Sequence, residues 1–511
     1  MVTLGKQKGL ERLLEIFGSL SQAELRYLKN YLTAFHNKGT NKALELVELI
    51  EKERNLSQDD YSRRLYGDPK SKAFIMLKGR LMEKILETLM LSVNFQNNPA
   101  YQEDPAAFES IDLLKNLTYA HLLRRRGLDH AAEEILRDCV QKATQLQLPE
   151  IKVQALAHLR NIATSEQEMW GMRRDIELGL RQYESDLMGV GYFDEFRALR
   201  AEKTSQEQAT IEYLQHNCKV LEDRLEEAYS TRAHYYYLLL RQYLHELLQE
   251  STELRRTAEE MIALLTANPG IGSKNRKGIP YLQLAMLDLK QANFAQTILS
   301  ADQALSLFHE KKKNTLAAST CKLYACMYLG QLDDAEALIR KLDVFRQQKR
   351  LDQSTGIVIY LESCLAYLRG NTKQAIQILN STTELLTDKE GWNVGIRTFE
   401  ILLLIDQDKL DLVSARVENL RKHLARYQID NRQQLIYRCL QSLERVSYSF
   451  SQLPPDFHKN FEQLQSREWS PLSDEFVRFE WWVAARMARK PYLEVQLSHT
   501  GSSLEVGEFE V

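Results

Sequence analysis

One glycine-rich stretch of this chain could hold a phosphate group. Residues 268–278 combine glycines with Lys274, Arg276 and Lys277, and backbone amides beside basic side chains can cradle an anion. A phosphate loop also needs a preceding strand and a helix N-terminus aimed at the anion. Because helical periodicity over residues 252–266 precedes this stretch, the pattern favours a long loop between helices over a nucleotide site.

Cysteines and histidines could serve as nucleophiles or metal ligands. Cys321 and Cys326 are five residues apart, so they fall on different faces of a helix and indicate buried packing rather than a metal or redox pair. His121, His234 and His423 stand alone on helical patterns. The motifs H-E-x-x-H, G-x-S-x-G and G-x-x-x-x-G-K-[ST] do not occur. We therefore predict no catalytic residue, cofactor or metal site, and expect that the chain is not an enzyme.

Composition and charge indicate a cytoplasmic helical protein. The 511 residues include only 21 Gly and 10 Pro, and the net charge is −3, which gives no overall bias toward nucleic acid or acidic lipid. No run approaches the ~18 apolar residues of a membrane span, and charges interrupt the apolar positions of the first 17 residues, unlike a signal peptide. Six scattered cysteines do not make a disulfide framework. We expect no membrane association.

The sequence pattern predicts a separate helical domain over residues 1–98. Ser21 and Glu24 form a capping box, and Ser57 with Asp60 caps a later helix. The pattern predicts helices over residues 21–35, 41–54, 57–67 and 70–93. Between Tyr192 and Asn268, 77 residues lack both Gly and Pro, which predicts long helices with breaks near residues 204–208 and 229–231.

The same domain carries the strongest nucleic-acid signal. It holds 16 Lys and Arg against 12 Asp and Glu, and Arg63, Arg64, Lys72 and Arg80 are candidate contacts in a helix-turn-helix reading. Lys78, however, falls on the apolar arc of its helix, so the positive side chains do not share one face. A solvated face of a capping or dimerising domain is the favoured interpretation, and we predict weak or no binding to duplex DNA.

A recurring spacing organises the remainder of the chain. A Gly or its substitute is followed by an apolar or small residue five positions on and another four later. The copies are Gly127-Ala132-Leu136, Ala292-Thr297-Ala301, Gly330-Ala335-Ile339, Gly370-Ala375-Leu379 and, more loosely, Asp408-Val413-Val417. The last four begin 38, 40 and 38 residues apart. A fixed period of this size is typical of stacked helical hairpins.

These residues resemble the tetratricopeptide repeat. In that family a small residue lies midway along the first helix, a glycine-containing turn follows, and a second small residue opens the next helix. Ala120, Ala285 and Ser363 match the first position, whereas Leu323 departs from it. The resemblance covers residues 280–425 and, weakly, 105–279. Because the period exceeds the usual ~34 residues, HEAT-type repeats of about 40–47 residues remain the alternative architecture.

The resemblance also implies a concave groove that binds a protein or peptide. Its lining comes from first-helix positions three, six and ten residues before each turn residue. Carried onto this sequence, with one neighbour added, the candidate groove residues are Tyr324, Met327, Tyr328, Tyr360, Cys364 and Tyr367. Tyrosines are enriched in binding hot spots. The alternative is that they pack between hairpins. The side chains with which some family members clamp a peptide carboxylate are absent, so a C-terminal carboxylate ligand is not implied.

The C-terminal end changes pattern twice. Ser470 and Pro471 predict a helix start, and an apolar stripe with Trp482 predicts a helix that caps the array. After Pro491 the apolar period becomes two, which predicts a strand-like acidic tail. This tail is disordered, lies against the array or pairs with a second copy.

The sequence as a whole predicts an all-α protein with a TPR-like superhelix. Its expected parts are a small N-terminal helical domain (1–98), a repeat array (105–453), capping helices (454–490) and the short strand-like tail (491–511). The favoured function is a cytoplasmic scaffold or adaptor that binds a protein or peptide. A TPR-containing transcriptional regulator with a nucleic-acid-binding N-terminal domain is the alternative. A homodimer through the N-terminal domain or the tail is compatible with both.

Overall fold

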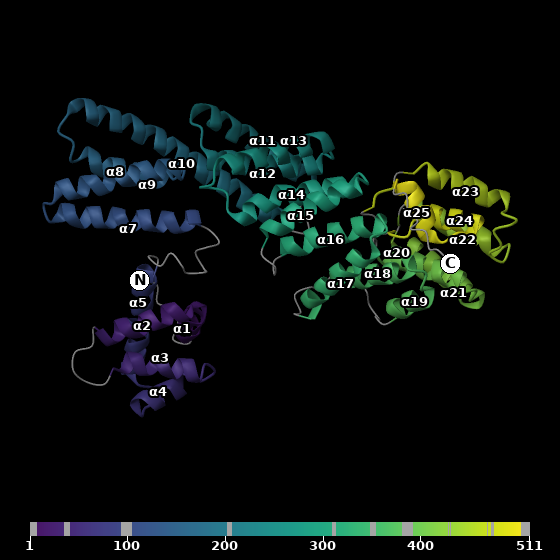
Figure 1. The fold of residues 1–511 in the computed structure, drawn as a ribbon, viewed down its shortest axis with the longest axis horizontal. Coiled ribbons are helices and arrows are strands. Elements are labelled where there is room, and N and C mark those ends of the chain that lie inside the picture. Colours follow the sequence, from purple (N-terminus) through teal and green to yellow (C-terminus); the bar gives the residue numbers. More distant parts are fainter. Residues whose placement is uncertain are drawn as a thin grey trace, which may run out of the picture. The chain divides into compact units, whose positions relative to one another are not determined.

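The chain is helical throughout the part that the structure describes, as the sequence predicts. This computed structural model describes residues 8–34, 41–92, 105–201, 207–308, 313–347, 354–380, 392–427, 429, 431–467, 469–471 and 475–501. Helices are the only regular secondary structure within these residues (Figure 1). The chain divides into two compact units, Met1–Glu184 and Ser185–Val511, which we describe separately.

The first unit begins with five helices around a core of their own. They are α1 (Lys8–Ser19), α2 (Gln22–Ala34), α3 (Lys42–Lys52), α4 (Gln58–Tyr66) and α5 (Lys72–Ser92). The capping box before α2 is present, since Ser21 N–H donates to Glu24 Oε2 at 2.7 Å and Glu24 N–H donates to Ser21 Oγ at 3.3 Å. Ser57 caps α4 in the same manner. The predicted helices are confirmed within a few residues, and α1 was not predicted.

The first unit continues with α7 (Pro105–Arg125), α8 (Asp129–Gln145), α9 (Pro149–Arg160) and the start of α10 (Glu166–Ala201). These helices bury a second, separate core. Helix α10 is 36 residues long and runs on into the second unit. Most of this helix precedes the stretch from Tyr192 to Asn268 that lacks Gly and Pro. The helices described within that stretch have 17 to 21 residues, and the break between them at residues 228–230 agrees with the predicted break near 229–231. Most of the other predicted break, near 204–208, lies outside the described residues.

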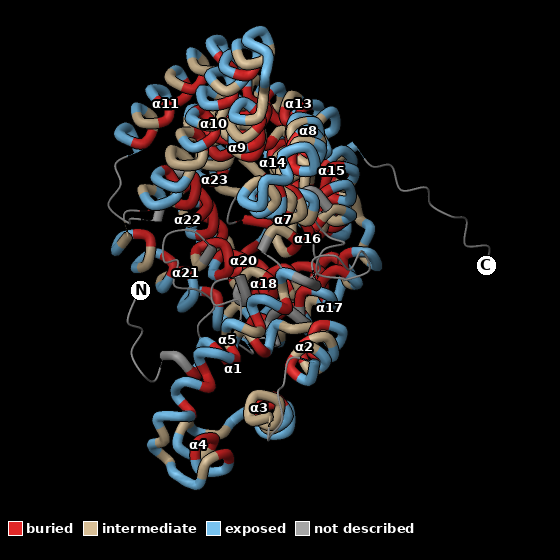
Figure 2. The backbone as a smooth tube through the Cα atoms, turned by 90° about the vertical axis from the view of Figure 1, so that its left-hand side faces the viewer, coloured by how far each residue is buried: buried red, intermediate tan, exposed pale blue. Residues whose placement is uncertain are grey.

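The second unit is a succession of helices that pack mainly against their neighbours in the chain. They are α11 (Glu207–Glu227), α12 (Thr231–Leu247), α13 (Ser251–Ala267), α14 (Lys274–Lys290), α15 (Phe294–Leu307), α16 (Lys313–Tyr328), α17 (Leu332–Gln347), α18 (Ser354–Leu368), α19 (Thr372–Asn380), α20 (Trp392–Asp406), α21 (Leu410–Tyr427), α22 (Asn431–Glu444), α23 (Pro455–Gln465), α24 (Phe479–Ala488) and α25 (Tyr492–Thr500). Figure 2 shows that α20 is mostly buried, because helices on several sides cover it.

The turn residues of the recurring pattern adopt the backbone conformation that the pattern requires. Gly127, Gly330 and Gly370 have φ between +72° and +77°, and Ala292 and Asp408 have φ of +59°. In this left-handed conformation the next N–H can reach back to the carbonyl of the last helical turn, which ends the helix. The prediction that helix pairs are joined at these five positions is confirmed.

The small residues of the pattern lie where the paired helices approach each other. Ala285, Ala335 and Ala375 are completely buried. Ser363 is also buried, and its Oγ donates to the carbonyl of Ala375 at 2.7 Å, so the two small positions of one pair meet directly. Larger side chains would hold these helices apart, which explains why the pattern is restrictive here.

Three C-terminal and loop predictions are wrong in part. The predicted strand-like tail begins instead with helix α25, and residues 502–511 lie outside the described residues. Leu493 and Leu497 alternate with polar residues but are also four positions apart, which suits one face of a helix. Helix α24 starts at Phe479 rather than after Pro471. The glycine-rich loop ends at Ser273, whose Oγ accepts from Arg276 N–H and caps α14.

Candidate functional site

The six predicted groove residues lie together, on α16 and α18. Tyr324, Met327 and Tyr328 come from the last turns of α16, and Tyr360, Cys364 and Tyr367 come from α18. We call these six residues the tyrosine face. All six are buried, with exposed fractions from 0% to 8%. What covers them is largely the end of the same chain, residues 475–501, which we call the C-terminal segment.

The tyrosine face holds the main chain of the C-terminal segment by hydrogen bonds. Tyr328 Oη donates to the carbonyl of Phe476 at 3.3 Å, and Phe476 N–H donates to Tyr360 Oη at 3.2 Å. Further along the segment, Gln496 Nε2 donates to the carbonyls of Met327 and Tyr328 at 2.8 Å and 3.3 Å. The N–H and carbonyl of Phe476 and the amide nitrogen of Gln496 therefore have hydrogen-bond partners in a buried contact.

Aromatic rings surround the same contact. The Tyr328 ring lies 4.6 Å from the ring of Phe476 and 6.4 Å from that of Trp481, measured between centroids. The ring of Tyr367 lies 5.6 Å from that of Tyr492. Burial raises the pKa of Tyr328 well above its usual value, so this hydroxyl stays a hydrogen-bond donor. In this structure the tyrosines are therefore packing residues, which is the alternative to a groove lining that the sequence left open.

A buried ion cluster anchors the start of the C-terminal segment. Arg432 of α22 donates through Nη2 to Glu480 Oε2 at 2.8 Å and through Nε to Glu475 Oε2 at 3.1 Å. The side chains of Arg432, Glu475 and Glu480 are 9%, 2% and 5% exposed. Arg478 adds a second contact to Glu480 at 3.1 Å. Removing Arg432, Glu475 or Glu480 would take a partner from a buried charge, which is costly in free energy.

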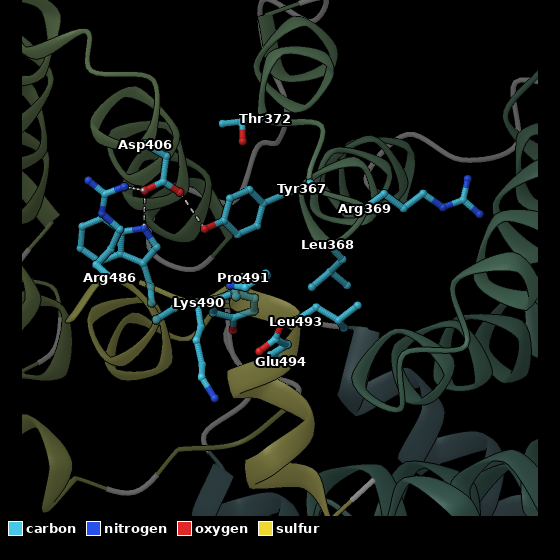
Figure 3. A pocket seen from close by; sticks show the side chains of 14 residues that line it. Tyr367, Leu368, Arg369, Thr372, Asp406, Arg486, Lys490, Pro491, Leu493 and Glu494 are labelled. Atoms are coloured by element: carbon cyan, nitrogen blue, oxygen red, sulfur yellow. Dashed lines mark hydrogen bonds and ion pairs between the residues drawn. The ribbon is translucent and has the colours of Figure 1, made fainter. Parts of the chain in front are cut away.

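A hollow of about 550 Å³ remains open beside this covered face. Its walls come from the ends of α18 and α20, the start of α19, and α24 and α25. Figure 3 shows Tyr367 and Arg486 directed at Asp406, which lies at one side of the hollow. Leu368, Pro491 and Leu493 supply apolar surface. The hollow is thus partly apolar, with one carboxylate at a defined position.

Asp406 is the distinctive polar group of the hollow. Tyr367 Oη donates to Asp406 Oδ2 at 2.7 Å and Trp482 Nε1–H donates to Oδ1 at 3.0 Å. The guanidinium of Arg486 is 3.7 Å away, too far for a hydrogen bond. Burial raises the pKa of Asp406, and these three neighbours offset only part of the effect. The carboxylate is therefore held in a fixed orientation by two hydrogen bonds, with one guanidinium nearby.

The charged residues at the rim differ in what they contact. Arg369 points away from Asp406 in Figure 3 and pairs with Glu336 at 2.8 Å and Asp333 at 2.7 Å. Lys490 and Glu494 line the opposite side and are exposed. A ligand side chain entering the hollow would meet Asp406 and this mixed rim rather than the Arg369 guanidinium.

The candidate nucleic-acid contacts are divided between two helices of the first unit. Arg63 and Arg64 lie on α4, where each pairs with an acid: Arg63 with Asp60 at 3.4 Å, and Arg64 with Glu53 at 2.5 Å. Lys72 and Arg80 lie exposed on α5.

Lys78 lies on the buried side of α5, as its place on the apolar arc predicted. It is 8% exposed, and its Nζ donates to Gln58 Oε1 at 2.5 Å. Burial lowers the pKa of Lys78. Lys78 is thus one positive side chain of the N-terminal domain that is directed into the protein rather than toward a duplex.

The cysteines have structural positions. All six are unpaired thiols and buried, and burial raises the pKa of Cys139 to about 11, which keeps it unreactive. In the described ranges, no three His, Cys, Asp or Glu side chains gather closely enough to hold a metal ion. Nor does any described helix have the length and apolar character needed to cross a bilayer.

Of the Asp406 cluster, the sequence predicted only Tyr367 as a binding residue, and Asp406 and Arg486 were not predicted. Asp406 stands two residues before the turn residue Asp408, at the end of the apolar run Ile401–Ile405. A carboxylate that directly continues a buried run is the one signal that could have marked it. Trp482 was noticed only as part of an apolar stripe, and its indole N–H supplies the hydrogen bond.

Comparisons with known proteins identify no relative of this chain. No family model, curated protein or solved structure matches the chain.

Proposed function

We propose that this chain is a protein-binding scaffold or adaptor that takes a basic side chain of a partner into the hollow at Asp406. The observation that carries the proposal is the Asp406 carboxylate, only 13% exposed, held by hydrogen bonds from Tyr367 and Trp482 at one side of an open hollow. A polar group fixed inside a partly apolar hollow is the usual arrangement of a binding site.

A TPR-like array is the architecture that we propose for residues 105–453. It is supported by the left-handed turn residues at a spacing of 38 to 40 and by the buried small residues between paired helices. Arrays of this kind are binding surfaces. A cytoplasmic location accompanies the proposal, since the six free thiols suit a reducing compartment.

The C-terminal segment illustrates what this surface can recognise. The tyrosine face donates to and accepts from the main chain at Phe476, and large rings enclose the contact. These are the interactions by which a groove holds a peptide. We propose that the C-terminal segment occupies the tyrosine face of its own chain and that a partner binds in the hollow next to it.

The chemistry of Asp406 defines the partner's side chain. A carboxylate can accept about four hydrogen bonds, and Tyr367 and Trp482 supply one each. A Lys ammonium or an Arg guanidinium of the partner would add donors and a second positive charge beside that of Arg486, whose guanidinium is 3.7 Å from Asp406. The apolar wall at Leu368 and Pro491 suits the methylene stem of such a side chain.

A peptide library tests this proposal. Purified protein should select peptides that contain Lys or Arg, and Asp406→Asn should weaken the selected peptides about 10- to 100-fold, because a hydrogen bond to a charged group is worth about 1.5–3 kcal/mol. Asp411→Asn, at an exposed position of α21, is the matched control and should bind normally. Selection of no peptide, or equal binding by Asp406→Asn, would contradict the proposal.

The regulator alternative receives no specific support. Arg63 and Arg64 pair with acids on the surface, and Lys78 is buried, so these three positive side chains do not form one free basic face for several phosphates.

A further inference from the structure

Helix α5 presents apolar side chains on two opposite sides. Phe74, Leu77, Leu81 and Ile85 belong to the buried core of the N-terminal helices. On the other side, the large side chains Ile75, Met76, Leu86 and Met90 are 40%, 59%, 50% and 50% exposed. Single exposed apolar residues are ordinary, but several on one helix face indicate a contact surface.

The exposed side chains form a continuous stripe. At about 100° per residue, positions 72, 75, 76, 79, 83, 86 and 90 fall within an arc of about 100°. The stripe is about 27 Å long at ~1.5 Å per residue. Its arc width is that of a helix face which packs against another helix. The core of α1–α5 is already complete on the opposite side.

The stripe is symmetric about position 81 except at Ile75, whose counterpart is Glu87. Met76 and Leu86 lie five residues to either side, Gly79 and Glu83 lie two to either side, and the ends of the stripe are Lys72 and Met90. Two copies of α5 that cross antiparallel near this position would place Met76 of each against Leu86 of the other. A surface that complements itself in this manner is what a two-fold dimer requires.

Glycine and charge at the centre suit the same arrangement. A Cβ on Gly79 would meet nothing within 4 Å, so the space above it is open and a second helix can approach the backbone closely. Arg80 and Glu83 are both exposed. In the antiparallel crossing, Arg80 of one copy and Glu83 of the other lie at nearly the same height along the helix axis. The difference is about one residue, or ~1.5 Å of helix rise. The two copies would then form two pairs of opposite charges near the centre of the contact.

We propose that two copies of this chain pair through the α5 stripe, antiparallel and centred near position 81. The dimer does not depend on the hollow at Asp406. The sequence suggested two homodimer surfaces, the N-terminal domain and the tail. The α5 stripe belongs to the first of them.

The oligomeric state of the full chain tests the pairing. Analytical ultracentrifugation over a range of micromolar concentrations should show a monomer–dimer equilibrium for the unmodified protein. Met76→Glu with Leu86→Glu should shift the dissociation constant at least 100-fold. Leu299→Glu, at a 61% exposed position of α15, is the matched control and should not change it. Circular dichroism checks that each variant folds.

A charge exchange identifies the antiparallel geometry. Arg80→Glu alone and Glu83→Arg alone should each dimerise about tenfold more weakly, because like charges then meet across the interface. Mixing the two single variants should restore dimers as heterodimers. In a heterodimer the Glu at position 80 of one chain meets the Arg at position 83 of the other, whereas in each homodimer like charges meet. An ion pair within one helix cannot produce this rescue.

Three results would overturn the proposal. One is a monomer at all concentrations, which would mean that the stripe is covered by the protein's own chain or by another protein. A second is a dimer that survives Met76→Glu with Leu86→Glu, and the third is a mixture of the charge variants that remains monomeric.

Discussion

Replacing Arg432 by Met would remove the cation that two buried carboxylates share. The methionine keeps most of the side-chain volume but removes the guanidinium that binds Glu475 and Glu480 at 2.8–3.1 Å. Both glutamates are at most 5% exposed, so water cannot take the place of the guanidinium. The C-terminal segment, which carries both glutamates, should then detach from α22 and from the tyrosine face.

The size of this effect follows from the geometry. Removing one partner of a buried ion pair costs about 3–5 kcal/mol. Arg478 still contacts Glu480 at 3.1 Å, which places the expected loss near the lower end, at about 3 kcal/mol. A loss of this size raises the population with a detached segment roughly 150-fold.

Hydrogen exchange measured along the chain reports this detachment. In Arg432→Met, the amides of residues 476–497 should exchange about 100-fold faster or more, because their protection depends on the attached state. Amides of α14 and α15, far along the chain from the ion cluster, should change little. Arg416→Met is the matched control: it breaks an ion pair with Glu400 in which Arg416 is 48% exposed, and such pairs are worth at most about 1 kcal/mol. Equal exchange in the two variants would refute the reasoning.

Three further predictions concern the same region. Tyr360→Phe removes the oxygen that accepts from Phe476 N–H and should lower the free energy of unfolding by about 1–3 kcal/mol in urea denaturation, because a buried donor loses its partner. Burial works to raise the pKa of Glu480, but its hydrogen bonds and charge pairing with arginine hold it below the usual 4.5. The stabilisation is thus complete above pH 4.5 and is lost as the pH falls through the folded-state pKa, which tryptophan fluorescence during acid titration should report. Gly330→Ala and Gly370→Ala should each cost about 1–2 kcal/mol in thermal unfolding because both have positive φ. Gly330→Ala should cost more, since its Cβ would also meet α25 at 3.2 Å.

The turns of the repeat could be predicted because their conformation restricts the residue type. Gly127, Gly330 and Gly370 stand where φ is positive, and few side chains tolerate this backbone. Gln249 has φ of +58° and makes an equivalent turn between α12 and α13. Because glutamine carries no such signal, this turn was not predicted individually.

The C-terminal helix and the hollow depend on contacts between distant residues. Gln496 binds the carbonyl of Met327, 169 positions earlier in the chain. Asp406 binds Tyr367 and Trp482, which are 39 and 76 positions away. Local periodicity does not encode such pairings, so the alternation after Pro491 was interpreted as a strand, although tertiary burial favours a helix there.

Photo-crosslinking inside cells tests the central claim, that a partner binds at the hollow through Asp406. A photoreactive amino acid placed at Leu493, which lines the hollow, should capture a specific protein in cells that express this chain. The account predicts that Asp406→Asn abolishes this capture while Asp411→Asn preserves it, and that a photoreactive group at Leu299 captures a different set of proteins. Capture of the same proteins with Asp406→Asn, or from Leu299, would contradict the account.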